Sequence, residues 1–84
     1  MSDYVDFEGP TVDEVQPHVA TIVSLFLDIK HDDGETDYGF IWDAIKDDME
    51  GGVEATGGPD FHDDGVWGVA KSLAIKELRR RDEY

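Results

Sequence analysis

Residues 17–30, Pro-His-Val-Ala-Thr-Ile-Val-Ser-Leu-Phe-Leu-Asp-Ile-Lys, decide the fold, because their apolar side chains recur with the period of a helix. At about 100° per residue these side chains cover well over half of the helix circumference. They are Val19, Ile22, Val23, Leu25, Phe26, Leu27 and Ile29. A helix that is apolar on so many sides is central in a small domain, or faces a partner as well as its own core. Since proline is tolerated in a first helical turn, we predict that this helix begins near Pro17.

The residues before this helix combine a helix-start signal with a helix breaker. Thr11 and Glu14 have the spacing of a capping box. Pro17 lies within the second turn of the helix that this box would start, where it removes a backbone hydrogen bond and clashes with a carbonyl. We therefore predict only a short turn over residues 12–16. Before it we expect an N-terminal arm, residues 1–10, that is extended or forms an edge strand.

Two further helical segments follow the first. The segment 38–49 has one apolar stripe and one acidic side, and the segment 65–82 has a similar apolar face. Between them, residues 50–64 are rich in glycine and contain a proline, which predicts a long loop. The predicted architecture is a single all-α domain over residues 1–84, with an arm at 1–10, helices at 17–30, 38–49 and 65–82, and a Gly-rich loop at 50–64.

The charge of the chain is strongly negative. Among 84 residues there are 21 Asp and Glu against seven Lys and Arg, so the formal net charge is −14. Such a composition resembles that of proteins from halophiles that accumulate salt, in which salt screens the self-repulsion of the folded chain. An acidic disordered tail and a mimic of nucleic acid are the alternatives. The aromatic and branched apolar residues argue against disorder.

The sequence contains neither an apolar run long enough for a membrane span nor a start typical of a signal peptide. We therefore expect a protein of a salt-rich cytosol, or of a virion, that does not enter a membrane. The length suits one modest core, so a deep enclosed enzyme pocket is not expected.

The positive charges are gathered at one end of the chain. Residues 1–65 contain only Lys30 and Lys46 against 18 acids, whereas residues 66–84 have a net charge of +2. Cations near the end of a helix complement its dipole, but three consecutive arginines point in three directions around it. We therefore predict a partner-binding surface for a protein partner or a second copy. Its residues are Lys71, Ile75, Lys76, Arg79, Arg80 and Arg81.

The tetrapeptide His-Asp-Asp-Gly occurs twice, at residues 31–34 and 62–65, and offers imidazole and carboxylate groups to a divalent ion. Neither copy fits an EF-hand, since Lys71 stands where the second copy would need its closing Glu. Turn formation and helix capping are the simpler interpretation, although ion binding by these loops stays open.

Catalysis is not expected from this sequence. His18, His31 and His62 could act as bases, but no nucleophile, phosphate-binding loop or oxyanion stabiliser accompanies them, and the chain has no Cys. We predict no catalytic residue, no metal site and no cofactor.

Residues 41–81 show a family resemblance. Ile41 to Met49, a Gly/Pro loop, and the pattern Val69-Ala70-x-x-Leu73-Ala74-x-x-x-Leu78 before Arg79–Arg81 resemble the small helical head–tail adaptor (connector) proteins of tailed viruses. The resemblance implies a virion structural protein that assembles into rings beneath a portal. The segment 11–30 has no counterpart in that family.

The predicted function is therefore that of a non-enzymatic assembly or protein-interaction subunit, from a halophile or its virus. In a head-to-tail assembly, Arg79–Arg81 would meet an acidic neighbour such as Asp47 and Asp48. The alternative is a small DNA-associated regulator that uses the basic C-terminal helix, against which the acidic remainder of the chain would repel phosphates.

Overall fold

The computed structural model describes the backbone of residues 10–84 and the side chains of residues 12–52 and 57–84. It contains the helices α1 (Pro10–Leu27), α2 (Tyr38–Thr56) and α3 (Asp64–Arg80), with a π-helical turn η1 (Asp28–Asp32) after α1. The described residues include no strand, so the predicted all-α, three-helix fold is confirmed. Of the predicted arm, residues 1–9 lie outside the described residues, and Pro10 belongs to α1.

Helix α1 begins seven residues earlier than predicted, at Pro10 rather than at Pro17. Pro10 suits the first helical position, where its missing N–H has no partner in any case. Pro17 lies inside the helix with its ring exposed to solvent. Val15, which lies two residues before it, is fully buried, and this burial offsets the cost of about 3 kcal/mol for an interior proline.

The predicted helix over 17–30 also ends differently. The α-helix stops at Leu27, and the chain continues as the wider turn η1 to Asp32. Gly34, with a φ of 69°, then reverses the chain, and the Glu35 N–H donates to the Ile29 carbonyl at 3.3 Å. Asp37 caps α2 by accepting from the Phe40 N–H at 3.3 Å.

Helix α2 continues to Thr56 and α3 begins at Asp64, so the predicted loop over 50–64 is wrong in its first seven residues and in its last. Gly51 and Gly52 are helical although each costs about 1 kcal/mol relative to Ala in a helix interior. The helix gives way only before Gly57 and Gly58, whose φ values are 80° and 156°. The loop before α3 is therefore residues 57–63.

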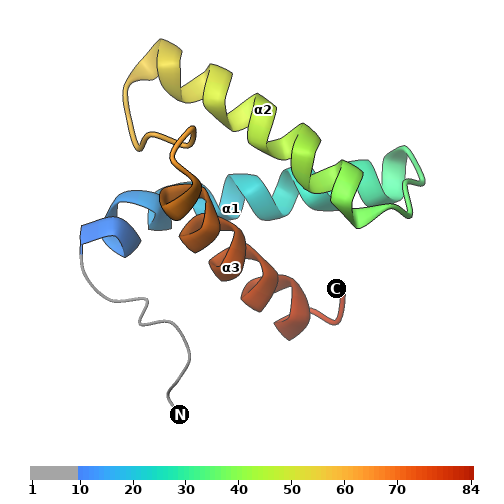
Figure 1. Ribbon diagram of the computed structural model, residues 1–84. Coiled ribbons are helices and arrows are strands. Elements are labelled where there is room, and N and C mark those ends of the chain that lie inside the picture. The colour runs from blue at the N-terminus through green and yellow to red at the C-terminus, as the bar shows by residue number, and fades with distance from the viewer. Residues whose placement is uncertain (1–9) are drawn as a thin grey trace.

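The core forms where α1 packs against both other helices (Figure 1). In this view α2 lies above α1, and α3 crosses α1 and descends below it. Phe26 is fully buried and contacts the rings of Tyr38, Trp42 and Tyr84. The buried apolar residues are Val15, Val19, Ile22, Val23, Phe26, Ile41, Trp42, Ile45, Met49, Phe61, Trp67, Ala70, Ala74 and Leu78.

Helix α3 ends at Arg80, two residues before the predicted end at residue 82. Asp82 has a φ of 63°, and its N–H donates to the Arg79 carbonyl at 3.0 Å. The Glu83 N–H donates to the Leu78 carbonyl at 2.8 Å. This pair of hydrogen bonds is a Schellman motif, with Asp82 in the position that glycine usually takes.

The segment after α3, residues 81–84, turns back toward η1 and α2 because of this motif. Lys30 Nζ donates to the Glu83 carbonyl at 2.6 Å, and Trp42 Nε1 donates to the Tyr84 hydroxyl at 3.4 Å.

Within residues 10–84, no helix has the length and apolar character needed to cross a membrane.

Candidate protein-interaction surface

The inner and outer faces of α3 follow from its sequence. Asp63 caps the helix, since its Oδ1 accepts from the backbone N–H of Gly65 at 2.8 Å and of Val66 at 3.2 Å. Trp67, Ala70, Ala74 and Leu78 are buried at helical spacing. The basic residues fall between these positions, so α3 presents its cations at the margins of the core and to solvent.

Two of the three arginines pair with one carboxylate. Arg80 donates from Nε to Glu77 Oε1 at 3.0 Å and from Nη2 to Glu77 Oε2 at 2.7 Å. Arg81 Nε donates to the same Oε2 at 2.7 Å. These hydrogen bonds lower the pKa of Glu77 to about 2, and those from Arg80 have a larger effect than the one from Arg81. The side chains of Arg80 and Arg81 remain 74% and 49% exposed, so they are oriented by Glu77 without being covered.

Arg79 and Lys71 lie over aromatic rings instead. Arg79 Cζ is 5.7 Å from the centre of the Tyr84 ring, and Lys71 Nζ is 5.5 Å from the centre of the Trp42 ring. Both distances suit a cation–π contact. These two predicted partner-binding residues therefore stabilise the tail and the α2–α3 contact within the chain.

A groove of about 450 Å³ lies between α1 and α3, and we call it the α1–α3 groove. Helix α1 contributes Gln16, Val19, Ala20 and Val23, and α3 contributes Leu73, Lys76, Glu77 and Arg80, with Arg81 following directly after the helix. The floor of the groove is apolar. Its α3 rim has three positive groups against one negative group.

The groove brings together Lys76, Arg80 and Arg81 of the six predicted partner-binding residues. Lys76 is exposed and forms no ion pair with the described part of the chain. Ile75 is half-buried against the core, and with Ser72, Lys76 and Arg79 it lines a second depression of about 360 Å³.

Sequence reasoning did not identify the α1 side of the groove. The available signal was that apolar side chains cover well over half of the circumference of the helix predicted over residues 17–30. This coverage left open whether the helix also contacts a partner. The register of α1 against α3 places Val19 and Val23 at the groove, and this register is a tertiary feature.

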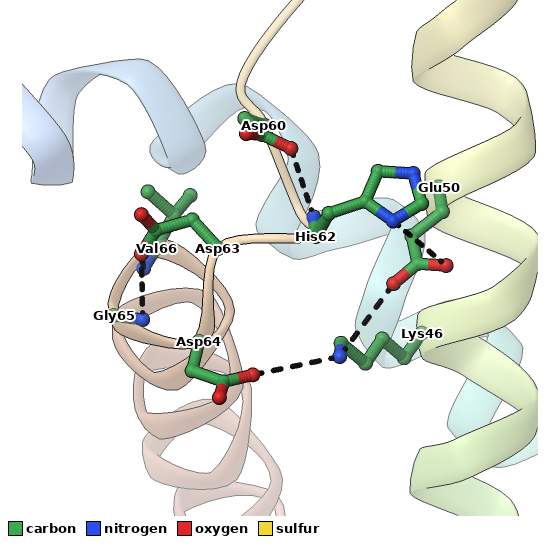
Figure 2. Close-up of polar contacts among 8 residues, drawn as sticks. All are labelled: Lys46, Glu50, Asp60, His62, Asp63, Asp64, Gly65 and Val66. Atoms are coloured by element: carbon green, nitrogen blue, oxygen red, sulfur yellow. Dashed lines mark hydrogen bonds and ion pairs between the residues drawn. The ribbon is translucent and has the colours of Figure 1, made fainter.

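A second polar cluster joins the loop 57–63 to α2 (Figure 2). Lys46 Nζ lies 3.6 Å from Glu50 Oε2 and 3.7 Å from Asp64 Oδ1, and His62 Nδ1 lies 3.5 Å from Glu50 Oε1. Asp60 Oδ1 accepts from the His62 N–H at 3.0 Å. The cluster holds the start of α3 beside α2, which is a structural role.

The two His-Asp-Asp-Gly copies have different structures. Residues 62–65 end the loop and cap α3 through Asp63, whereas residues 31–34 end η1 and reverse the chain. In the part of the chain that the structure describes, no group of three or more His, Asp or Glu side chains is placed to hold a metal ion.

The remaining histidines take part in packing and in the tail contact. His18 packs edge-on against Phe61, with ring centres 5.7 Å apart. His31 Nε2 lies 3.0 Å from Glu83 Oε1. Hydrogen bonds from His31 and, with a smaller effect, from Lys30 lower the pKa of Glu83.

Comparison with known proteins gives no counterpart: no family model, no curated protein and no solved structure matches the chain.

Proposed function

We propose that this chain is a non-enzymatic assembly or protein-interaction subunit whose binding surface is the α1–α3 groove. One observation carries the proposal: a molecule with a net charge of −14 sets three cations, Lys76, Arg80 and Arg81, beside an apolar groove. An apolar floor supplies binding energy through desolvation, and the cations select an acidic partner. The ligand class is an acidic protein segment with apolar side chains on one face.

The orientation of the rim supports this choice. Glu77 holds Arg80 in a two-bond arrangement that leaves the Arg80 side chain 74% exposed. A side chain already held in place loses less conformational entropy when a carboxylate binds. Lys76 supplies a further exposed ammonium on the same rim.

We propose a saline setting for this function, in a halophile or a virus of one, and a virion connector as one form of it. The support is the acidic composition and the resemblance of residues 41–81 to head–tail adaptor proteins. A DNA-associated regulator is the alternative function, supported by the exposure of Arg80 and Arg81 at the end of α3.

An NMR titration in molar KCl tests the proposal with two probes, an amphipathic Glu/Leu peptide and a DNA duplex. The peptide is expected to shift the methyl signals of Val19, Val23 and Leu73. A double variant with Lys76→Gln and Arg80→Gln should bind the peptide about tenfold more weakly or worse. The reason is that hydrogen bonds to charged groups are worth about 1.5 to 3 kcal/mol.

The charge-preserving exchange Lys76→Arg is the control, and it should bind the peptide nearly as the unmodified chain does, because it keeps the cation on the rim and leaves Arg80 in place. A Lys/Leu peptide of the same length should not bind. Peptide binding that ignores the Gln exchanges would contradict the proposal. Binding of the duplex without any peptide binding would favour the DNA-associated regulator.

A further inference from the structure

We infer that the occupant of the α1–α3 groove is the outward face of α2 in a second copy of this chain, with Phe40 as the residue that enters the groove. The inference rests on the proposed function and names its partner. It joins two surfaces of the same molecule that lie on different elements and are complementary in charge and polarity.

Phe40 is the apolar side of this pairing. Among the large hydrophobic residues that the structure describes, Phe40 and Tyr84 are exposed, and Phe40 has the larger exposed fraction, 56% against 39%. The Asp37 cap fixes the start of α2 and directs Ile41 and Trp42 into the core, which leaves Phe40 on the solvent side. A single exposed Phe is ordinary; its surroundings are what make this one informative.

Those surroundings are acidic. On a helix, residues three, four and seven positions after Phe40 share its face, and they are Asp43, Ala44 and Asp47. Both aspartates are exposed, and Ala44 is half-buried. We call these four residues the Phe40 face: one aromatic ring and a small residue, flanked by two carboxylates.

The groove is the complement of this face. Val19, Val23 and Leu73 provide apolar contacts, and Lys76, Arg80 and Arg81 provide cations at the rim. An apolar cavity of about 150 Å³ accepts a benzene ring, so a groove of about 450 Å³ has room for the Phe40 side chain. The carboxylates of Asp43 and Asp47 would then face the α3 rim.

The two surfaces can be occupied at the same time. The groove is lined by α1, α3 and the adjoining Arg81, while the Phe40 face belongs to α2. A contact between different surfaces of two copies is heterologous. The copy that supplies Phe40 keeps its groove free, and the copy that supplies the groove keeps its Phe40 face free, so further copies can add at either end. Association therefore depends on both surfaces of every internal copy.

Salt distinguishes this contact from an ordinary charge-driven one. Two copies that each have a net charge of −14 repel at low salt, and screening removes this long-range repulsion. The apolar contact of Phe40 is not screened. Self-association should therefore strengthen from tenth-molar to molar KCl, whereas DNA binding weakens with salt.

Mixing two variants tests the inference by light scattering after size exclusion in molar KCl. Phe40→Gln removes the Phe40 face and keeps the groove; Lys76→Glu with Arg80→Glu disables the groove and keeps the Phe40 face. The unmodified chain should show a mass that rises with concentration. Each variant alone should elute as a monomer, and a mixture of the two should give a heterodimer that does not grow further.

The expected loss for Phe40→Gln is about tenfold or more in the association constant, because the burial of a Phe side chain is lost. Phe40→Leu is the matched control and should retain association. Asp43→Lys with Asp47→Lys, added to the groove variant, should restore association by reversing both charges. A cooperative thermal melt from each variant would show that it is folded.

Three outcomes would overturn the inference: an unmodified chain that stays monomeric in molar KCl, a Phe40→Gln variant that still self-associates, or a mixture without heterodimer. If the Glu/Leu peptide still binds the groove in these cases, the proposed function stands and only the second copy as occupant is rejected. If the peptide also fails to bind, both are rejected.

Discussion

Among the residues that the structure describes, Asp82 is the one whose backbone departs most from what its side chain prefers. Its φ of 63° is left-handed, a conformation that glycine adopts readily and that Asp adopts at some cost. The conformation directs Glu83 and Tyr84 back toward the domain, where they contact Lys30 and the aromatic cluster around Phe26. The conformation of one residue thus directs the tail against the edge of the core.

Asp82→Gly is expected to raise the free energy of unfolding by up to about 1 kcal/mol, since glycine removes the left-handed strain but adds freedom to the unfolded chain. Asp82→Val should lower it, because a β-branched residue does not tolerate a positive φ. Thermal melts in molar KCl measure both changes. A glycine variant less stable than the valine variant would contradict the assigned conformation.

Glu77 gives the stability of the domain an acid dependence. Its pKa is lowered from 4.5 to about 2 in the folded chain by hydrogen bonds from Arg80 and Arg81. A lowered pKa means that the stabilising contribution is complete above the unfolded value and is lost as the pH falls through the folded value. The relevant window is therefore pH 4.5 to 2.

Glu77→Gln should be less stable than the unmodified chain at neutral pH, and the two should converge as the pH falls from 4.5 to 2. Denaturant melts across this window in molar KCl provide the measurement. The comparison isolates Glu77 because all other carboxylates are shared by the two proteins. A stability difference that does not change with pH would show that the Arg80 and Arg81 hydrogen bonds are not formed.

At the scale of the element, α1 and α2 are each longer than local preference allows. Pro17 lies inside α1, and Gly51 and Gly52 lie inside α2. Each of these residues disfavours a helix interior. Helix α1 extends to the N-terminal side of Pro17 because Val15 is buried in the core there, and the burial of Met49 anchors α2 as far as the glycines. The ion pair between Lys46 and Glu50 adds a smaller contribution to α2.

Gly51→Ala and Gly52→Ala should each raise the free energy of unfolding by about 0.5 to 1 kcal/mol, or several degrees in Tm. Both sites are exposed, and an added Cβ meets no atom within 4 Å. Gly57→Ala is the matched control, because its φ of 80° makes the same exchange destabilising. If Gly51→Ala and Gly52→Ala were destabilising, α2 would end before residue 51 in solution.

At the scale of the whole molecule, the negative charge is distributed around one small core. Among the described side chains few carboxylates have a cation within ion-pair distance, and those that do include Glu50, Glu77 and Glu83. Like charges elsewhere on the surface repel one another, and salt reduces this repulsion. The stability of the fold and the proposed self-association should therefore both increase with salt concentration.

The melting temperature should fall as KCl is lowered from about 1 M to about 0.1 M, since the Debye length rises from about 3 to about 10 Å. Asp47→Asn with Asp48→Asn should reduce this dependence, because both side chains are exposed and contribute to the repulsion. Circular dichroism at each salt concentration records the transition. A Tm that stays constant over the range would show that repulsion between carboxylates does not limit the stability of the fold.

The amino-acid sequence by itself determined the fold class, the number of helices, and most of the buried face of each helix. The period of the apolar residues is a local property, so the sequence places Val19, Ile22, Phe26, Ile41 and Trp42 in the core, and all five are buried. The uneven distribution of charge was equally visible, and it pointed to α3 as the candidate binding element.

Only the tertiary structure decided where the helices begin and end and what the basic residues do. Helix formation on the N-terminal side of Pro17 depends on the burial of Val15 in the core, which no local pattern contains. The pairing of Arg80 and Arg81 with Glu77 depends on where α3 ends. The placement of Arg79 over Tyr84 and the groove between α1 and α3 depend on how distant segments pack. The helical period of apolar residues depends on near neighbours along the chain. The register between helices and the positions of the helix ends depend on contacts between residues that are distant in the sequence, and a local pattern does not encode such contacts.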